Sequence, residues 1–342
     1  MRAAVFHGAG DIEITDRPVP RPGPGELLLE VAAVGICGTD AHEFRSGPHV
    51  FPGDGFIPGH EFSGHVVELG EGLDRFSPGD LVASGAGVSC GRCPPCRDGV
   101  TNRCLEYATV GLQLPGALAE FVAVPGEVCL EVGSIGLSPD VAALAQPMSI
   151  AVHAARRGRA RPGESALVIG AGGIGAFLIY VLASAGIEVL AVELDPGRRE
   201  IAAALGATAV GLPDTVRDRE SPSVIYEVTG TPQGLMLALD AAAAGSRVVL
   251  VGLQDGPTPI ELRPISLGEV ELIGTNAHVF AIDFPEAVRL LASRAQGWSD
   301  IAPFAIPLDG LVEQGLLPMV EGRTTSIKVL IDPGVDRTRP TS

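Results

Sequence analysis

Residues 165–195 read SALVIGAGGIGAFLIYVLASAGIEVLAVELD, and this stretch decides the fold of the second half of the chain. A short apolar run, ALVI, ends at the glycine turn 170–175, a helical run follows, and Gly186 closes it before the β-rich run IEVLAV. This order predicts a strand-turn-helix-strand unit of a parallel sheet with both faces covered. A membrane span is the alternative for such an apolar stretch, and the glycine breaks argue against it.

The rest of the chain changes rhythm near residue 148. From 148 to 280, β-rich runs such as SVIYEVTG and SRVVLVGL alternate with helical runs such as REIAAALG. This alternation predicts an α/β domain with a doubly wound parallel sheet of the Rossmann type. Over residues 1–147, short β-rich runs such as LLLEVAAVGIC and AEFVAVP are separated by Gly/Pro turns, which predicts a β-rich, partly barrel-like domain.

Composition narrows the possible partners. The chain has 342 residues, enough for two separate cores, and its formal net charge is −17. So acidic a chain is not expected to bind nucleic acid or anionic membranes, and small-molecule chemistry fits better. The N-terminal MRAAVFHGAG lacks the apolar core of a signal peptide, so we expect a cytoplasmic protein with reduced cysteines.

The glycine turn predicts a dinucleotide site because of its context. It follows an apolar strand, opens a helix, and is followed about 20 residues later by Glu193, where a carboxylate can accept hydrogen bonds from the adenosine ribose. That carboxylate would repel a 2′-phosphate, so NAD is expected over NADP, although Arg198 complicates this preference. The alternative is a purely structural turn. The expected contact residues are Gly170, Gly172, Gly173, Ile174, Gly175, Glu193 and Arg198.

Two groups of residues could hold metal ions. The first is Cys90, Cys93, Cys96 and Cys104, in SCGRCPPCRDGVTNRC. Four thiolates bind zinc without an open position, so this ion would be structural, with an iron-sulfur cluster or a redox dithiol as alternatives.

The second group comes from GICGTDAHEF, with Cys37, Thr39, Asp40 and His42, and from PGHEFSG, with His60 and Glu61. One thiolate, one imidazole and an adjacent carboxylate form a catalytic zinc site that keeps a position for water or alcohol. We therefore expect Cys37, His60 and Glu61 to hold a catalytic zinc ion.

Together these motifs resemble the zinc-dependent medium-chain alcohol dehydrogenases. The resemblance is strongest to the butanediol and polyol (sorbitol-like) dehydrogenases, and it rests on GICGTDAHEF, PGHEFSGHVVELG, DFPEAVRLLAS and IPLDGLVEQG. It implies that residues 281–342 return to a GroES-like catalytic domain formed with 1–147, while 148–280 bind the dinucleotide. It also implies a homodimer or homotetramer.

The resemblance further implies a mechanism. Zinc stabilises the alkoxide of a secondary alcohol, diol, polyol or cyclitol, and hydride passes to NAD. The alkoxide proton leaves through the Thr39 hydroxyl, the cofactor ribose and then His42. Residues expected by resemblance to line the nicotinamide and pyrophosphate are Thr229, Val251, Gly252 and Lys328.

Gln146 is the main departure from the family pattern, because relatives place a Glu at this position, before the Pro in AQPMSI. Three arrangements remain open: Cys37, His60 and Glu61 with water; recruitment of Gln146; or weakened or absent zinc. The last would make the protein a zinc-free reductase or a non-catalytic dinucleotide-binding protein. A metal-stabilised structural or regulatory protein without redox activity is a third class.

Three further expectations concern residues outside these motifs. Cys129 lacks a partner motif and is expected to be a buried free thiol. His49 is expected to be a packing or surface histidine, although it lies in the loop before PGHE and could reach the substrate. The polar, Pro-containing end of the chain, VDRTRPTS, is expected to fray.

Overall fold

The computed structural model describes residues 1–216 and 221–342. The chain divides into two compact units, one formed by Met1–Ser149 with His278–Ser342 and the other by Ile150–Ala277. The boundaries expected from the sequence lay after residues 147 and 280. Among the described residues, every helix is too short or too polar to span a lipid bilayer.

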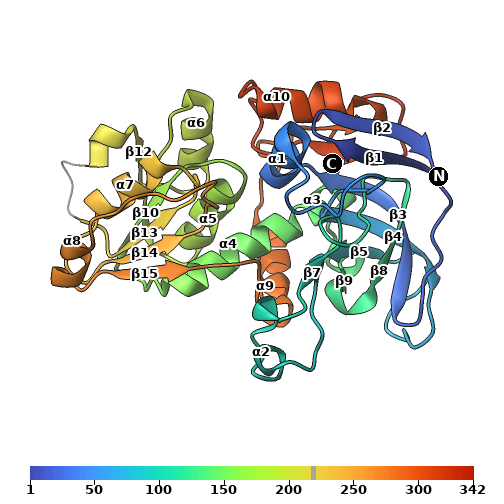
Figure 1. Ribbon diagram of the computed structural model, residues 1–342, viewed down its shortest axis with the longest axis horizontal. Coiled ribbons are helices and arrows are strands. Elements are labelled where there is room, and N and C mark those ends of the chain that lie inside the picture. The colour runs from blue at the N-terminus through green and yellow to red at the C-terminus, as the bar shows by residue number, and fades with distance from the viewer. Residues whose placement is uncertain (217–220) are drawn as a thin grey trace. The chain divides into compact units, whose positions relative to one another are not determined.

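The second unit is built on a parallel sheet with the strand order β12-β11-β10-β13-β14-β15 (Figure 1). Its strands are β10 (Ser165–Ile169), β11 (Glu188–Val192), β12 (Ala209–Gly211), β13 (Val224–Glu227), β14 (Arg247–Leu250) and β15 (Glu271–Gly274). The order runs outward in both directions from β10 and β13, which is the doubly wound Rossmann topology. The fold class expected from the sequence is therefore confirmed.

Helices flank this sheet and explain why its strands are apolar. They are α4 (Ala145–Gly158), which begins in the first unit, α5 (Gly173–Ser184), α6 (Pro196–Ala204) and α7 (Pro232–Asp240), whereas the short α8 (Leu262–Leu267) buries none of its residues. Local sequence fixes where two of them begin, because the Asp195 and Thr231 side chains each accept a hydrogen bond from a first-turn backbone N–H and a proline follows each cap. Leu167, Ile225 and Val248 are fully buried beneath them.

The first unit is β-rich, as expected. Its main sheet has the order β18-β16-β17-β3-β4-β5-β9, and β8 also pairs with β3. These strands are β3 (Glu26–Gly35), β4 (Glu61–Leu69), β5 (Leu81–Ser84), β8 (Phe121–Pro125), β9 (Cys129–Glu131), β16 (Phe304–Pro307), β17 (Leu330–Asp332) and β18 (Arg339–Pro340). Two smaller ribbons pair β1 (Arg2–Gly8) with β2 (Asp11–Asp16), and β6 (Gly87–Val88) with β7 (Ala108–Thr109).

The helices of this unit are mostly short. They are α1 (Gly38–Ser46), α2 (Pro94–Arg97), α3 (Pro139–Ala143), α9 (Phe280–Ser293) and α10 (Leu317–Val320), with a π-helical stretch at Leu311–Leu316. β17, from near the end of the chain, pairs antiparallel with β3, from near its beginning. Residues near both ends of the sequence therefore share one core, which includes Leu29, Val34, Ile306 and Ile331.

The end of the chain does not fray, so that expectation was wrong. Arg339 of β18 pairs with Ala305 of β16, and the Thr341 backbone N–H donates to the carbonyl oxygen of Pro303 at 3.2 Å. The Arg339 guanidinium donates two 2.8 Å hydrogen bonds to the buried carboxylate of Asp140, and the Ser342 backbone N–H donates a third at 2.7 Å. A buried carboxylate needs such partners, and local composition could not reveal this distant one.

Candidate active site

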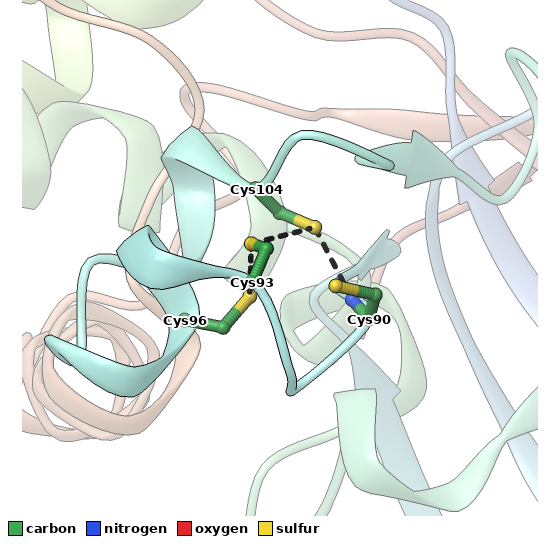
Figure 2. A group of neighbouring side chains, drawn as sticks. All are labelled: Cys90, Cys93, Cys96 and Cys104. Atoms are coloured by element: carbon green, nitrogen blue, oxygen red, sulfur yellow. Dashed lines mark hydrogen bonds between the residues drawn. The ribbon is translucent and has the colours of Figure 1, made fainter.

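Cys90, Cys93, Cys96 and Cys104 form a compact set of sulfur donors in the first unit, and the segment 90–104 that carries them is called the four-cysteine lobe below. Their sulfur atoms all lie within 4.8 Å of one another and face a common centre (Figure 2). Backbone N–H groups of Cys90 and Glu106 donate to the sulfur of Cys104 at 3.2 and 3.3 Å. The Leu105 backbone N–H is the main cause that lowers the pKa of Cys93 to about 6, so a thiolate forms readily there. Four sulfurs held this way match a closed structural zinc site.

The second cluster brings together Cys37, His60 and Glu61. Cys37 is the N-cap of α1, where Asp40 accepts a 2.9 Å hydrogen bond from the Cys37 backbone N–H. Glu61 opens β4 and pairs in register with Gly35 of β3, which places His60 and Glu61 beside the residue that precedes α1. Ligand atoms of Cys37, His60 and Glu61 lie within 4.8 Å of one another. Sequence motifs predicted these members, and strand pairing assembles them.

Asp40 stands behind His60 and was not predicted as a site residue. Its Oδ1 lies 3.7 Å from the His60 Nδ1, and neither atom has a hydrogen-bond partner among the described residues. Burial opposes protonation of His60, but the charge of Asp40, together with Cys37, outweighs it and raises the pKa of His60 to about 9. The same negative surroundings attract a divalent cation, and a carboxylate behind an imidazole is a frequent second partner of zinc ligands.

Lys328 supplies the unexpected contact of this cluster. Its ammonium Nζ lies 2.6 and 2.5 Å from the two carboxylate oxygens of Glu61, and both side chains are buried. Lys328 was predicted to contact the cofactor, whereas here it neutralises a predicted zinc ligand. It is also the only lysine among the 24 basic residues of the chain. Because the sequence contains one lysine, this residue could have been singled out from the sequence.

The remaining predicted residues of the first unit lie on α1 and α4. The Cys37 thiol donates to the Thr39 hydroxyl at 3.9 Å, so Thr39 borders the cluster. His42 lies further along α1, half-buried, with its ring stacked on His49 at 4.7 Å between centroids. Gln146 is buried in the first turn of α4, and its backbone carbonyl accepts a hydrogen bond from Ser149. Cys129 is a buried free thiol in β9, as expected.

In the second unit, the glycine turn joins β10 to α5. A Cβ on Gly175 would lie 1.9 Å from the carbonyl oxygen of Gly170, so only glycine permits this close crossing of helix and turn. Glu193, directly after β11, accepts hydrogen bonds from the backbone N–H groups of Ala171 and Asp195 at 2.8 and 2.9 Å. Its carboxylate thus ties the turn to the end of the next strand.

Arg198 lies close to the glycine turn. One of its guanidinium nitrogens is 3.7 Å from the position that a Cβ would take on Gly172, and its Nε is buried without a hydrogen-bond partner in the part of the chain that the structure describes. A guanidinium placed here can contact an anionic or ribosyl part of a nucleotide.

Glu227 organises the carboxyl ends of β13 and β14 and was also not predicted. Its fully buried carboxylate accepts hydrogen bonds from the Thr229 and Gly230 backbone N–H groups at 2.8 and 3.1 Å. Its backbone carbonyl accepts from Val251 and Gly252 at 2.8 and 3.0 Å. Three predicted cofactor residues, Thr229, Val251 and Gly252, are therefore positioned by one glutamate.

Comparison with known proteins places this architecture in a family. The alcohol dehydrogenase GroES-like domain matches residues 23–134, and the zinc-binding dehydrogenase domain matches residues 173–293. The chain belongs to the zinc-dependent medium-chain alcohol dehydrogenase family, as the sequence motifs indicated.

Several members of this family are similar over nearly the whole chain. A 2-dehydro-3-deoxy-L-galactonate 5-dehydrogenase from Pseudoalteromonas atlantica is 32% identical, covering 97% of this chain and 98% of its own. The crystal structure of 2R,3R-butanediol dehydrogenase from Bacillus subtilis has a TM-score of 0.88 and 29% identity, covering 97% and 99%. A zinc-binding dehydrogenase from Sinorhizobium meliloti, bound to NADP, has a TM-score of 0.89 and 28% identity over 97% and 99%.

Proposed function

We propose that this protein is an NAD-dependent dehydrogenase that interconverts a secondary alcohol, diol, polyol or cyclitol and its ketone at a zinc centre held by Cys37 and His60. The observation that carries the proposal is the convergence of the half-buried Cys37 with the buried His60 and Glu61, with Asp40 behind the imidazole. A set of one thiolate, one imidazole and one carboxylate matches catalytic zinc rather than structural zinc. The four-cysteine lobe holds a second, structural ion.

The chemistry of the donor set fits zinc, and the unpartnered Nδ1 of His60 beside Asp40 adds to that fit. When bound, zinc acts as a Lewis acid that polarises the oxygen of an alcohol or ketone. Because Lys328 neutralises Glu61, Cys37 and His60 would be the primary ligands of a zinc ion, and Glu61 would be a third ligand only if it separated from the ammonium. Water or Gln146 would complete the set.

The chain's own residues move the proton. The Thr39 hydroxyl borders Cys37; it would accept the proton of the substrate hydroxyl while it releases its own hydroxyl proton to the next group of the relay. His42, half-buried on the same helix, is the group that passes the proton to solvent, since an imidazole nitrogen can take up a proton and the other can release one. Thr39→Val should lower kcat at least about 100-fold, the usual size of a general acid-base contribution, while the affinity for NAD stays nearly unchanged. Thr338→Val, at an exposed threonine, is the matched control, and unchanged turnover in Thr39→Val would remove the relay.

The proposed cofactor is NAD. Glu193 puts a negative charge next to the glycine turn, where a 2′-phosphate would be repelled. Arg198 lies over the same turn and works against this preference, and one similar structure holds NADP. Steady-state kinetics with both cofactors test the assignment. A kcat/KM at least about tenfold higher with NAD is expected, and a clear preference for NADP would contradict it.

The substrate class follows from the relatives, whose names include a galactonate-derived sugar-acid dehydrogenase and a butanediol dehydrogenase. Both names describe secondary alcohols with a neighbouring oxygen function. A screen of diols, polyols, inositols and amino-alcohols for NAD reduction, with zinc measured on the same sample, tests this class. Failure of every such substrate with a zinc-loaded protein would overturn it.

A second candidate function is a zinc-free reductase or a non-catalytic dinucleotide-binding protein of the same fold. Gln146 and the pairing of Glu61 with Lys328 favour it, because both reduce the negative charge offered to a metal ion. This candidate would be supported over the first if the protein bound the cofactor, held only one zinc ion and oxidised no alcohol.

The proposal includes a homodimer or homotetramer in the cytoplasm. β15 stands at one end of the parallel sheet; Leu272 in this strand is exposed, and so are Leu262 and Leu267 of α8, the helix that precedes it in the chain. An exposed strand edge with apolar neighbours can extend the sheet into a second copy. Light scattering coupled to size-exclusion chromatography tests the assembly, and a monomer at micromolar concentration would refute it. Zinc-binding thiolates fit a reducing compartment.

A further inference from the structure

Glu43, on α1 directly after His42, is a buried carboxylate that the proposed chemistry does not use. It accepts hydrogen bonds from three consecutive backbone N–H groups of the following loop. The distances are 2.9 Å from His49, 3.0 Å from Val50 and 3.3 Å from Phe51. Three N–H groups that converge on one buried carboxylate fix the path of a loop whose side chains are partly exposed.

The loop is shaped around this carboxylate. A Cβ on Gly47 would lie 2.7 Å from a carboxylate oxygen of Glu43 and 2.7 Å from its carbonyl oxygen, so position 47 has room only for glycine. At its far end the loop is anchored by Phe51, which packs on Phe6 and Phe56 at 5.2 and 5.0 Å between ring centroids. The backbone between these anchors has little freedom to move.

The fixed loop holds His49 on His42. The two imidazole rings stack with centroids 4.7 Å apart and planes 30° apart. Ser46 links them, because its hydroxyl donates to the His42 carbonyl at 3.2 Å and lies 3.0 Å from the His49 Nε2. A side chain that would otherwise rotate freely is therefore held on the ring of His42.

We propose that Glu43 and His49 are positioning residues for the proton relay: Glu43 fixes the loop at 49–51, and His49 holds the imidazole of His42 in the orientation for proton transfer. This inference rests on the relay of the proposed function. His49 contributes a ring face, so its shape matters more than its ability to titrate. Without this contact, His42 is less well oriented for proton transfer, whereas cofactor binding does not change.

Four variants test the inference. His49→Ala removes the ring, and His49→Phe keeps a ring in the same place. Glu43→Gln keeps the size of the buried side chain but replaces one acceptor oxygen with a donor group. Glu26→Gln is the matched control, because Glu26 also accepts a backbone N–H, from Gly23 at 2.8 Å, away from the relay.

The expected result is a split between turnover and binding. His49→Ala and Glu43→Gln should lower kcat about five- to tenfold, with a larger solvent deuterium isotope effect and an unchanged KM for NAD. His49→Phe should keep kcat within about twofold of the wild type, and Glu26→Gln should match the wild type. Unchanged kcat in His49→Ala, or no rescue by His49→Phe, would overturn the inference.

A readout independent of activity separates this inference from the proposed function. The chain has 7 histidines, so a carbon-proton spectrum of histidine-labelled protein resolves His42. His49→Ala and Glu43→Gln should both move the His42 ring signal, and an unmoved signal would disprove the positioning even in an active enzyme. If the signal moves but no substrate is turned over by the wild type, the proposed function fails while the contact stands. Because His49 is exposed, its variants remain informative if Glu43→Gln does not fold.

Discussion

Replacing Lys328 with Met removes the ammonium that neutralises Glu61 while keeping an unbranched side chain of similar length. In the metal-free protein, Glu61 would then be a buried carboxylate, 1% exposed, without its cation. At the observed separations of 2.5 and 2.6 Å, the Coulomb attraction is about 6 kcal/mol for an effective dielectric constant of about 20. Part of this is offset by the desolvation of both charges, so we expect Lys328→Met to lower the free energy of unfolding by about 3–5 kcal/mol.

Zinc changes the expected size of this loss. A divalent cation beside Cys37 and His60 can replace the missing ammonium as the partner of Glu61, so saturating zinc should recover a large part of the lost stability. The double variant Glu61→Gln/Lys328→Met leaves no buried charge at either position. It should therefore be more stable than Lys328→Met alone.

Urea unfolding with chelator and with excess zinc measures these differences. Arg323→Met, at an exposed ion pair with Glu321, is the control and should cost less than about 1 kcal/mol. A loss below about 1 kcal/mol in metal-free Lys328→Met would refute the argument, since a buried pair cannot be broken so cheaply. An equal loss in the Glu61→Gln background would refute it as well.

Three further predictions concern other parts of the first unit. Cys96→Ser should remove about one zinc ion per chain and expose the lobe to proteolysis, whereas Cys129→Ser should keep the wild-type zinc content; equal zinc in both would contradict the structural site. Asp40→Asn should weaken zinc at the Cys37–His60 centre about 10- to 100-fold in a chelator competition, and an unchanged affinity would remove Asp40 from the site. Burial opposes ionisation of Asp140, but Arg339 and Ser342 outweigh it and hold the pKa of Asp140 below its ordinary value of 3.8. Its stabilising effect is therefore present above that value and lost as pH falls through the lower folded pKa, so Asp140→Asn should be less stable by about 1–3 kcal/mol at pH 7, and this difference should shrink as the medium is acidified below the ordinary value; a pH-independent difference would disprove this.

Local signals made much of this protein predictable. The glycine turn, the apolar runs beside it and the caps of the following helices act within a few residues, so the Rossmann unit could be predicted from spacing alone. The four-cysteine lobe is also local, since its sulfurs come from a short stretch without a hydrophobic core. Cys37, His60 and Glu61 were predicted by motif, and their assembly depends on the register of β3 and β4.

Long-range electrostatic contacts could not be predicted in the same way. Lys328 is 267 residues from Glu61, and Arg339 is 199 residues from Asp140. No periodicity joins such pairs, because they arise when β17 and β18 enter the sheet formed with β3 and β16. Glu43 lies inside a recognised motif, but its role depends on where the loop after it returns. Sequence analysis therefore missed the buried ion pairs whose members lie far apart along the chain. The single lysine was the one sequence feature that pointed to such a pair.

The central claim is that Cys37 and His60 hold a zinc ion distinct from that of the four-cysteine lobe, and metal content tests it most directly. Zinc should be counted by mass spectrometry in the wild-type protein and in Cys37→Ser, both purified with zinc and dialysed. We predict about two ions per chain in the wild type and about one in Cys37→Ser, with the thermal stability of the cysteine lobe retained. One ion per chain in both proteins would contradict the account.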